Sequence, residues 1–268
     1  MPTVTVGRLR LYYERAGTGE PVMFISGLGA DHNLWYPIVE RLKGRYECII
    51  FDNRGIGQSS KPRIGYTMDD LTRDTLGLLD KLSLSKVHVV GMSMGGMVAL
   101  NMALERPAVV SSMVLSGSMA APDPRLMLVL NSRKVMQRRM KRSEYFRALA
   151  PWMFGPDTLG RPGFLESFVR ERSENPYPQR LQAFGQLVDG IGAFDVRASL
   201  GRIRVPTLVL VGEQDILTPP HLSRALAQGI PGAELVVLPG LSHFCASEDP
   251  DRFAEQLLRF FGGGALRA

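Results

Sequence analysis

The sequence predicts an α/β fold in which a mostly parallel sheet is covered by helices on both faces. Short apolar runs alternate with segments of helical periodicity over residues 1–118, and again over 203–268. Between these stretches, residues 119–202 show helical spacings cut by seven prolines and no convincing strand. We therefore expect a single domain, with an α/β core formed by the two outer stretches and a helical cap inserted between them.

The expected elements follow from residue periodicity, taken in chain order. The chain opens with two alternating segments, 3–6 and 8–14, joined at Gly7 as a hairpin that places antiparallel strands at one edge. The other expected strands are short apolar runs, at 21–26, 46–51, 86–90, 109–115, 207–211 and 234–238. The expected helices of the core are at 34–42, 68–82, 94–104, 222–228 and 250–261. The sheet therefore has eight strands, and the cap lies between strands 6 and 7.

Composition excludes several classes of protein. The 268 residues are 45% hydrophobic and 22% charged, which excludes a disordered chain. No apolar run approaches 18 residues and the N-terminus lacks a signal-peptide core, so we expect no membrane span and a cytoplasmic protein. The two cysteines, Cys48 and Cys245, form no disulfide framework, and no Cys/His spacing predicts a metal site.

The most informative motif is Gly91-x-Ser93-x-Gly95, which directly follows an apolar strand and directly opens a helix. A serine on so tight a turn needs neighbours without Cβ atoms, and the turn exposes its hydroxyl at the carboxyl end of the sheet. The helix that follows directs its N-terminus at the site and favours developing negative charge. We predict Ser93 to be a nucleophile; the alternative is an ordinary glycine-rich turn.

A serine hydroxyl needs a base, and the chain has four histidines. His88 lies inside the strand before Ser93 and is interpreted as structural. His221 follows two prolines near a helix start and should be exposed. His32 lies in the loop after the third strand and could approach the pocket. His243 lies just after the last strand, level with Ser93, and is the predicted base.

The base needs an acid, and the tetrahedral intermediate needs hydrogen-bond donors. Asp215 follows the strand before the last one and is the predicted acid, with Glu213 as its rival. The backbone N–H groups of Met94, after the nucleophile, and of Leu28, in the glycine-rich loop after the third strand, are the predicted oxyanion donors. Such a triad needs no metal or cofactor, and we expect none.

Five segments resemble, in order, the motifs of the α/β-hydrolase family. They are the oxyanion loop at 26–29, the loop after the fourth strand at 52–59, the nucleophile turn at 91–96, the strand and acid at 206–215, and the histidine loop at 240–250. Ser26 stands where the family usually has histidine. Asp52 and Arg54 are interpreted as tying loops together near the site. The resemblance covers nearly the whole chain and implies an α/β-hydrolase fold of the serine hydrolase branch.

The resemblance is greatest to small carboxylesterases and to 3-oxoadipate enol-lactonase-like hydrolases. A serine at the nucleophile position excludes the haloalkane dehalogenases and epoxide hydrolases of the family, which use aspartate. We expect a carboxylesterase with an acyl-enzyme mechanism and a small ester or lactone as substrate. The alternatives are an enol-lactone hydrolase, a carbon–carbon bond hydrolase, a cofactor-free perhydrolase, or a hydrolase-like receptor for a small ligand.

The cap should supply an apolar pocket, although Met and Phe at helical spacing are more often core. The candidate pocket residues are Trp35, Met127, Leu130, Met153, Phe154, Phe164 and Phe168. The formal charge is +6 and the pI about 9.5, with a basic run between Arg125 and Arg147. This run is interpreted as a solvated helix face or as an attractant for an anionic substrate. No nucleic-acid module is present, so we expect no nucleic-acid partner, and a monomer or small homo-oligomer.

Overall fold

The computed structural model describes residues 2–263, so that residues 264–268 of the predicted core lie outside the described part of the chain. Eight strands form one sheet in the order β1-β2-β4-β3-β5-β6-β7-β8. The strands are β1 (Thr3–Val6), β2 (Leu9–Ala16), β3 (Glu20–Ile25), β4 (Tyr46–Phe51), β5 (Val87–Met92), β6 (Val110–Ser116), β7 (Thr207–Gly212) and β8 (Glu234–Leu238). Strands β3 to β8 pair in parallel, and β1 and β2 are antiparallel at one edge. The predicted α/β class is confirmed.

Helices cover both faces of the sheet because side chains of the central strands alternate between two apolar clusters. Val22 and Phe24 of β3 belong to one cluster, whereas Met23 and Ile25 belong to the other. The first cluster is completed by α1 (Tyr36–Leu42), α10 (Cys245–Glu248) and α11 (Pro250–Phe261). The second is completed by α2 (Met68–Lys81), α3 (Met94–Glu105) and α9 (Pro220–Gly229). A sheet buried on both faces explains the nearly continuous apolar strand sequences.

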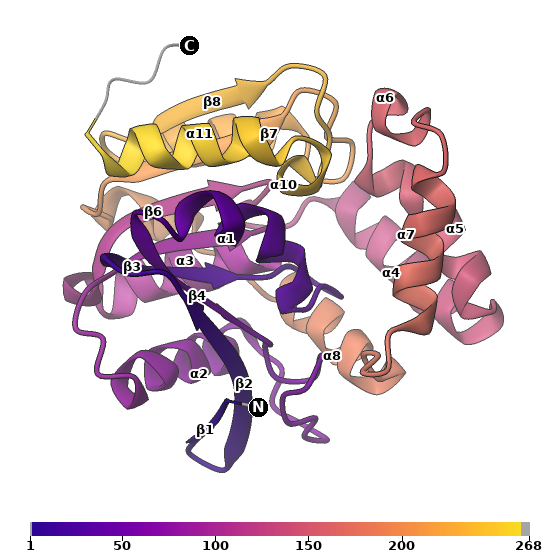
Figure 1. Cartoon of the computed structure of the whole chain (residues 1–268), viewed down its shortest axis with the longest axis horizontal. Helices are drawn as coiled ribbons and strands as arrows, with labels where there is room; N and C mark the ends of the chain where they lie inside the picture. Colours follow the sequence, from indigo (N-terminus) through magenta and orange to yellow (C-terminus); the bar gives the residue numbers. More distant parts are fainter. Residues whose placement is uncertain (1, 264–268) are drawn as a thin grey trace.

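The chain between β6 and β7 is helical, and its helices lie to one side of the sheet (Figure 1). They are α4 (Pro124–Arg139), α5 (Arg142–Met153), α6 (Pro156–Leu159), α7 (Phe164–Glu174) and α8 (Leu181–Gly192), followed by a 3-10 turn at Arg197–Arg202. The Asp123 carboxylate accepts a hydrogen bond from the Leu126 N–H at 2.7 Å and so caps α4. Several short helices at this place agree with the proline-interrupted sequence.

The cap is tied to the core through the segment that follows β8. The buried carboxylate of Glu248 accepts hydrogen bonds from the Gly155 N–H at 2.7 Å and from the Ser242 N–H at 2.5 Å. The Phe244 N–H donates to the Met153 carbonyl at 3.0 Å. One acidic side chain therefore holds both the cap and the loop that carries His243.

The element boundaries differ from the sequence expectation by a few residues. The helix expected at 34–42 is divided into a 3-10 helix, His32–Trp35, and α1, because Pro37 lies at the start of a new helix. Helix α9 begins two residues early, at Pro220, and the short α10 was not expected. Among residues 2–263, every helix is too short or too polar to cross a bilayer.

Candidate active site

Ser93 lies on the turn between β5 and α3 in a backbone conformation that is unusual for a residue with a side chain, with φ 52° and ψ −117°. Its flanking glycines are required by space. A Cβ on Gly91 would lie 2.4 Å from the Gly95 carbonyl oxygen, and a Cβ on Gly95 would lie 2.1 Å from that of Ile25. Such a conformation costs about 1–3 kcal/mol and persists where the surroundings impose it, commonly at functional sites.

His243 and Asp215 form a buried pair behind this turn. The His243 Nδ1–H donates to Asp215 Oδ2 at 2.9 Å, and both residues are 2% exposed. A carboxylate only accepts, so Nδ1 carries the proton and Nε2 of the neutral ring is left unprotonated. His243 lines the same small cavity as Ser93. Among the described residues no hydrogen bond links Ser93 to His243, and catalytic contacts of this kind often tighten only when substrate is bound.

Thr218 holds this pair in place, and it was not among the site residues predicted from the sequence. Asp215 Oδ1 accepts the N–H groups of Leu217 at 2.9 Å and of Thr218 at 2.8 Å. The Thr218 hydroxyl lies 2.7 Å from Asp215 Oδ2, 3.1 Å from His243 Nδ1 and 2.9 Å from the Gly117 carbonyl oxygen. The Asp-x-x-Thr spacing was an available signal, because an aspartate often bonds the backbone two or three residues further on.

The two predicted oxyanion donors lie beside Ser93. Leu28 and Met94 line the small cavity together with Ser93. A Cβ on Gly27 would lie 3.2 Å from Ser93 Cβ, so the loop backbone passes close to Ser93. Ser26, which replaces the family's usual histidine, anchors this loop: its hydroxyl accepts from Trp35 Nε1 at 2.9 Å and donates to the Asp31 carbonyl at 3.2 Å.

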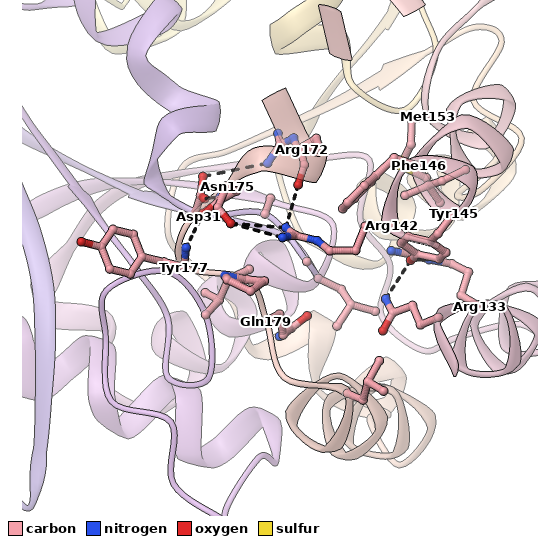
Figure 2. A pocket seen from close by; sticks show the side chains of 18 of the residues that line it. Asp31, Arg133, Arg142, Tyr145, Phe146, Met153, Arg172, Asn175, Tyr177 and Gln179 are labelled. Carbon is pink, nitrogen blue, oxygen red and sulfur yellow. Dashed lines mark hydrogen bonds and ion pairs between the residues drawn. The ribbon is translucent and has the colours of Figure 1, made fainter. Parts of the chain in front are cut away.

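Two cavities meet near Ser93. The small one, with a volume of about 20 Å³, has room for one water molecule beside Ser93 and His243. The larger one, here called the chamber, has a volume of about 590 Å³ and lies between the cap and the core (Figure 2). Four residues line both: Leu28, Arg133, Met153 and Phe244. A ligand that reaches Ser93 from the chamber therefore passes these four residues.

Five of the predicted pocket residues line a cavity, but they do not all line the same one. Leu130 and Met153 line the small cavity, and Phe168 lines the chamber. Phe154 and Phe164 line neither; they border another cavity, of about 810 Å³, beside His32.

The other two predicted pocket residues, Trp35 and Met127, line none of these three cavities. Trp35 is fully buried in the core beside Phe24 and Phe253, with its N–H on Ser26. The side chain of Met127 packs against Gly192 of α8. Large apolar residues fill the core and the cap as well as pockets, which is why composition failed to separate these roles.

Arg133 belongs to the basic run between Arg125 and Arg147, yet it lines the chamber. It is buried, and its Nε–H donates to the Tyr145 hydroxyl at 3.1 Å. A signal was available: Leu126, Leu130 and Arg133 share one face of α4 at spacings of four and three residues. Its neighbours Arg138 and Arg139 are exposed, as expected of a solvated face.

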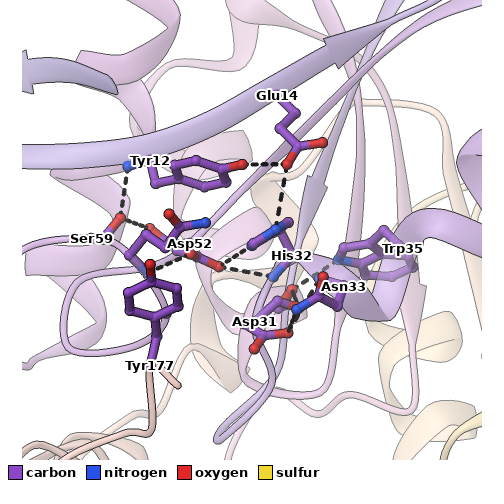
Figure 3. A network of polar contacts seen from close by, with 12 residues as sticks. Tyr12, Glu14, Asp31, His32, Asn33, Trp35, Asp52, Ser59 and Tyr177 are labelled. Carbon is purple, nitrogen blue, oxygen red and sulfur yellow. Dashed lines mark hydrogen bonds and ion pairs between the residues drawn. The ribbon is translucent and has the colours of Figure 1, made fainter. Parts of the chain in front are cut away.

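The other three histidines have structural partners. His32 Nδ1 lies 2.8 Å from Asp52 Oδ1, and its Nε2 lies 3.5 Å from Glu14 Oε1 (Figure 3). Burial lowers the pKa of His32, but its hydrogen bond to Asp52 and the nearby carboxylates outweigh burial and raise it above the ordinary value. His88 bonds Ser112 at 2.7 Å, and His221 is exposed. Of the four histidines, only His243 shares a cavity with Ser93.

The two cysteines are not rival nucleophiles. Burial raises the pKa of Cys48 to about 12 and that of Cys245 well above its ordinary value, so both thiols stay protonated. The Cys245 thiol donates to the Ser242 carbonyl at 2.9 Å. Within residues 2–263, no group of three or more His, Cys, Asp or Glu side chains is arranged to hold a metal ion.

Comparison with known proteins agrees with this architecture. Residues 20–250 match the family model of the alpha/beta hydrolase fold. A protein of Azorhizobium caulinodans named "Putative carbamate hydrolase RutD" is 30% identical over 262 residues, which are 98% of each chain. The enol-lactonase from Burkholderia xenovorans LB400 has a TM-score of 0.88 at 28% identity, over 97% of this chain and 100% of that one. A thermophilic esterase from Thermogutta terrifontis has a TM-score of 0.85 at 27% identity, over 97% and 96%. The chain therefore belongs to the α/β hydrolase family, and it is a hydrolase.

Proposed function

We propose that this hydrolase cleaves carboxylic esters through an acyl-enzyme, with Ser93 as nucleophile, His243 as base and Asp215 as the acid that orients it. One observation carries the proposal: Ser93, in its strained turn, shares a cavity with a histidine whose other ring nitrogen is bonded to a buried aspartate at 2.9 Å. That arrangement is typical of nucleophilic catalysis by serine.

The mechanism follows from the protonation states. Asp215 keeps the proton of the neutral ring on Nδ1, so that Nε2 is free to remove the proton of Ser93 as the hydroxyl attacks the carbonyl carbon. The backbone N–H groups of Leu28 and Met94 then stabilise the oxyanion. His243 returns the proton to the leaving alcohol, and afterwards it activates a water molecule that hydrolyses the acyl-enzyme.

The size of the small cavity limits how much of the acyl group fits beside Ser93. The small cavity beside Ser93 is lined by five methionines: Met92, Met94, Met97, Met119 and Met153. Methionine side chains are flexible and adapt to apolar groups of different shape. Because the small cavity has a volume of only about 20 Å³, we expect it to hold the first part of an acyl chain and the rest of the chain to extend past Leu28 and Arg133 into the chamber.

The test is hydrolysis of p-nitrophenyl esters from acetate to octanoate by the wild type and by Ser93→Ala. We expect Ser93→Ala to lower kcat by about 10⁴- to 10⁶-fold with an unchanged thermal transition. Ser132→Ala, at an exposed position of α4, is the matched control and should keep wild-type activity. Turnover by Ser93→Ala at the wild-type rate would exclude this mechanism.

The same measurement separates the enzyme from a hydrolase-like receptor. Repeated turnover of simple esters supports the enzyme. A single acylation without a second turnover, accompanied by a rearrangement of the cap, would favour the receptor. Two relatives, an enol-lactonase and a thermophilic esterase, support an ester or lactone as substrate over a carbon–carbon bond.

A further inference from the structure

Arg133 is a buried cation without an anionic partner. Its side chain, on α4, is 4% exposed, and the Cζ atom lies 5.1 Å from the centroid of the Phe184 ring. Its Nε–H is used by the Tyr145 hydroxyl. Within residues 2–263, no carboxylate lies at salt-bridge distance from Arg133, and neither of its Nη groups has a protein acceptor. Burial of an unpaired charge is costly, so such a group is retained where something else pairs with it.

The unpaired edge of Arg133 lies beside the oxyanion loop. A Cβ on Gly29 would lie 3.6 Å from Arg133 Nη2. The same arginine lines both the chamber and the small cavity that holds Ser93. The phenyl ring of Phe184 covers one face of the guanidinium, and Tyr145 takes the Nε–H, so the remaining donors lie in the plane of the group. Two Nη donors in one plane match the two oxygens of a carboxylate.

Gln179 provides an independent observation at the same place. Both polar atoms of its amide, Oε1 and Nε2, are buried and have no hydrogen-bond partner in the described structure. The Oε1 atom lies 3.9 Å from the position of that same Cβ on Gly29, and the side chain lines the chamber with Arg133 (Figure 2). A buried amide without partners costs free energy unless a ligand completes it, and its NH₂ group is a further donor for an anion.

The charge of the chamber favours the same ligand. Its lining contains four arginines, at positions 133, 142, 172 and 180, and one carboxylate, Asp31. Asp31 accepts from Asn175 Nδ2 at 2.7 Å and lies 3.9 Å from Arg172 Nη1. Arg142 donates to the backbone carbonyls of Arg172 and Asn175, which carry no net charge. The chamber is therefore positive overall and attracts anions toward Ser93.

We propose that Arg133 and Gln179 form a subsite for a carboxylate of the substrate. The natural substrates are then short acyl esters or lactones that carry a free carboxylate a few bonds from the scissile carbonyl. This inference rests on the proposed function of Ser93 and names the substrate class of the same site. Because Arg133 borders the small cavity, the carboxylate is held at the point where the acyl chain enters the chamber.

Binding of glutarate tests the subsite without any turnover. Titration calorimetry compares the wild type with Arg133→Met, which keeps an unbranched side chain and removes the charge. We expect the Kd for glutarate to rise by about 10- to 100-fold in Arg133→Met and by about 3- to 10-fold in Gln179→Leu. Arg138→Met removes the same charge from an exposed position of the same helix and is the matched control. It should bind glutarate as the wild type does.

Turnover provides the second readout. Mono-p-nitrophenyl glutarate and p-nitrophenyl pentanoate have acyl chains of equal length and differ in the carboxylate. We expect the wild type to prefer the glutarate ester, and Arg133→Met to lower the ratio of the two kcat/KM values by about 10- to 100-fold. Arg133→Lys keeps the charge but loses the planar pair of donors, so its ratio should lie between those of wild type and Arg133→Met.

The outcomes separate the subsite from the proposed function. Equal glutarate affinity in wild type and Arg133→Met, or no preference of the wild type for the glutarate ester, would overturn the subsite. Turnover by Ser93→Ala would overturn the proposed function alone, since glutarate binding does not depend on that hydroxyl. If Arg133→Met loses its cooperative thermal transition, Arg133→Lys and Gln179→Leu decide the question by the same two measurements.

Discussion

The molecule contains two buried histidine–aspartate pairs that are nearly identical in their central bond. His243 Nδ1 lies 2.9 Å from Asp215 Oδ2, and His32 Nδ1 lies 2.8 Å from Asp52 Oδ1. His32 begins the 3-10 helix that follows β3, and His243 lies in the loop that follows β8, so both come after the carboxyl end of a strand. They differ at the other ring nitrogen. That of His32 faces Glu14 at 3.5 Å, whereas His243 lines the cavity of Ser93.

The difference teaches that a histidine–aspartate bond is not by itself a sign of catalysis. Asp52 also accepts the N–H groups of His32 at 2.9 Å and of Gln58 at 2.8 Å, so this pair fastens two loops to each other. On the far side of the ring, Glu14 accepts a hydrogen bond from the Tyr36 hydroxyl at 2.8 Å. A carboxylate on each side of the ring leaves His32 no nitrogen with which to serve as a base for Ser93.

The largest contrast is expected between His243→Gln and His32→Gln. Loss of the proposed base should lower kcat for p-nitrophenyl esters by about 10⁴-fold or more. His32→Gln should keep kcat within about tenfold and lower the midpoint of urea unfolding, because Asp52 and Glu14 each lose their contact with the imidazole. Equal losses of kcat in both variants would mean that the two pairs act as one unit.

Substitution of the two aspartates should separate activity from stability in the same way. Asp215→Asn alters the tautomer of His243 and is expected to lower kcat by about 10⁴-fold with a smaller effect on stability. Asp52→Asn removes the charge that His32 and two backbone N–H groups share, and it should lower the free energy of unfolding by about 3 kcal/mol. Urea unfolding and steady-state kinetics on both variants check this. A stable Asp52→Asn protein without esterase activity would contradict the assignment.

The Thr218→Val variant tests whether the Thr218 hydroxyl helps to orient the proposed catalytic pair. The hydroxyl lies within 3.1 Å of both His243 and Asp215, and valine keeps the shape while removing it. Because a hydrogen bond to a charged group contributes about 1.5–3 kcal/mol, kcat should fall by about tenfold or more. Thr207→Val is the matched control, since the Thr207 hydroxyl bonds a backbone carbonyl elsewhere, at 2.8 Å. A Thr218→Val enzyme with unchanged kcat would show that the backbone alone orients Asp215.

The smallest expected effect is the pH dependence of stability due to His32. Its pKa in the folded protein is raised above the ordinary value of 6.5, so the folded state binds the proton more tightly than the unfolded chain. The resulting stabilisation is fully present below about pH 6.5 and is lost as pH rises through the folded pKa. The difference in unfolding free energy between wild type and His32→Gln should therefore be larger at about pH 5.5 than at about pH 8.5. Urea titrations at the two pH values measure it, and a difference that grows with pH would contradict the sign.

The sequence predicted those features that depend on the order of residues and elements along the chain. Alternating apolar runs and helices predicted the parallel sheet and its edge hairpin, because burial on both faces requires nearly continuous apolar strands. The positions of Ser93, Asp215 and His243 followed from the ends of three strands, since the carboxyl ends of parallel strands meet at one edge of the sheet. The roles of these three residues stay predictions until kinetics tests them.

The remaining site residues depend on contacts between segments far apart in the chain. Trp35 and Met127 have the composition of pocket residues, yet one fills the core beneath the oxyanion loop and the other packs within the cap. Arg133 belongs to a run of basic residues, and only the packing of Phe184, Tyr145 and the oxyanion loop around it distinguishes it from the exposed Arg138.

Sequence by itself determined the fold, the family and the order of the candidate triad, because these depend on periodicity and on short motifs at strand ends. Tertiary structure alone decided which histidine–aspartate pair shares a cavity with Ser93 and which apolar side chains border a cavity. It also decided which arginine is left without a partner. Burial and pairing are properties of surfaces that meet only in the folded chain, and no local pattern specifies both sides of such a contact.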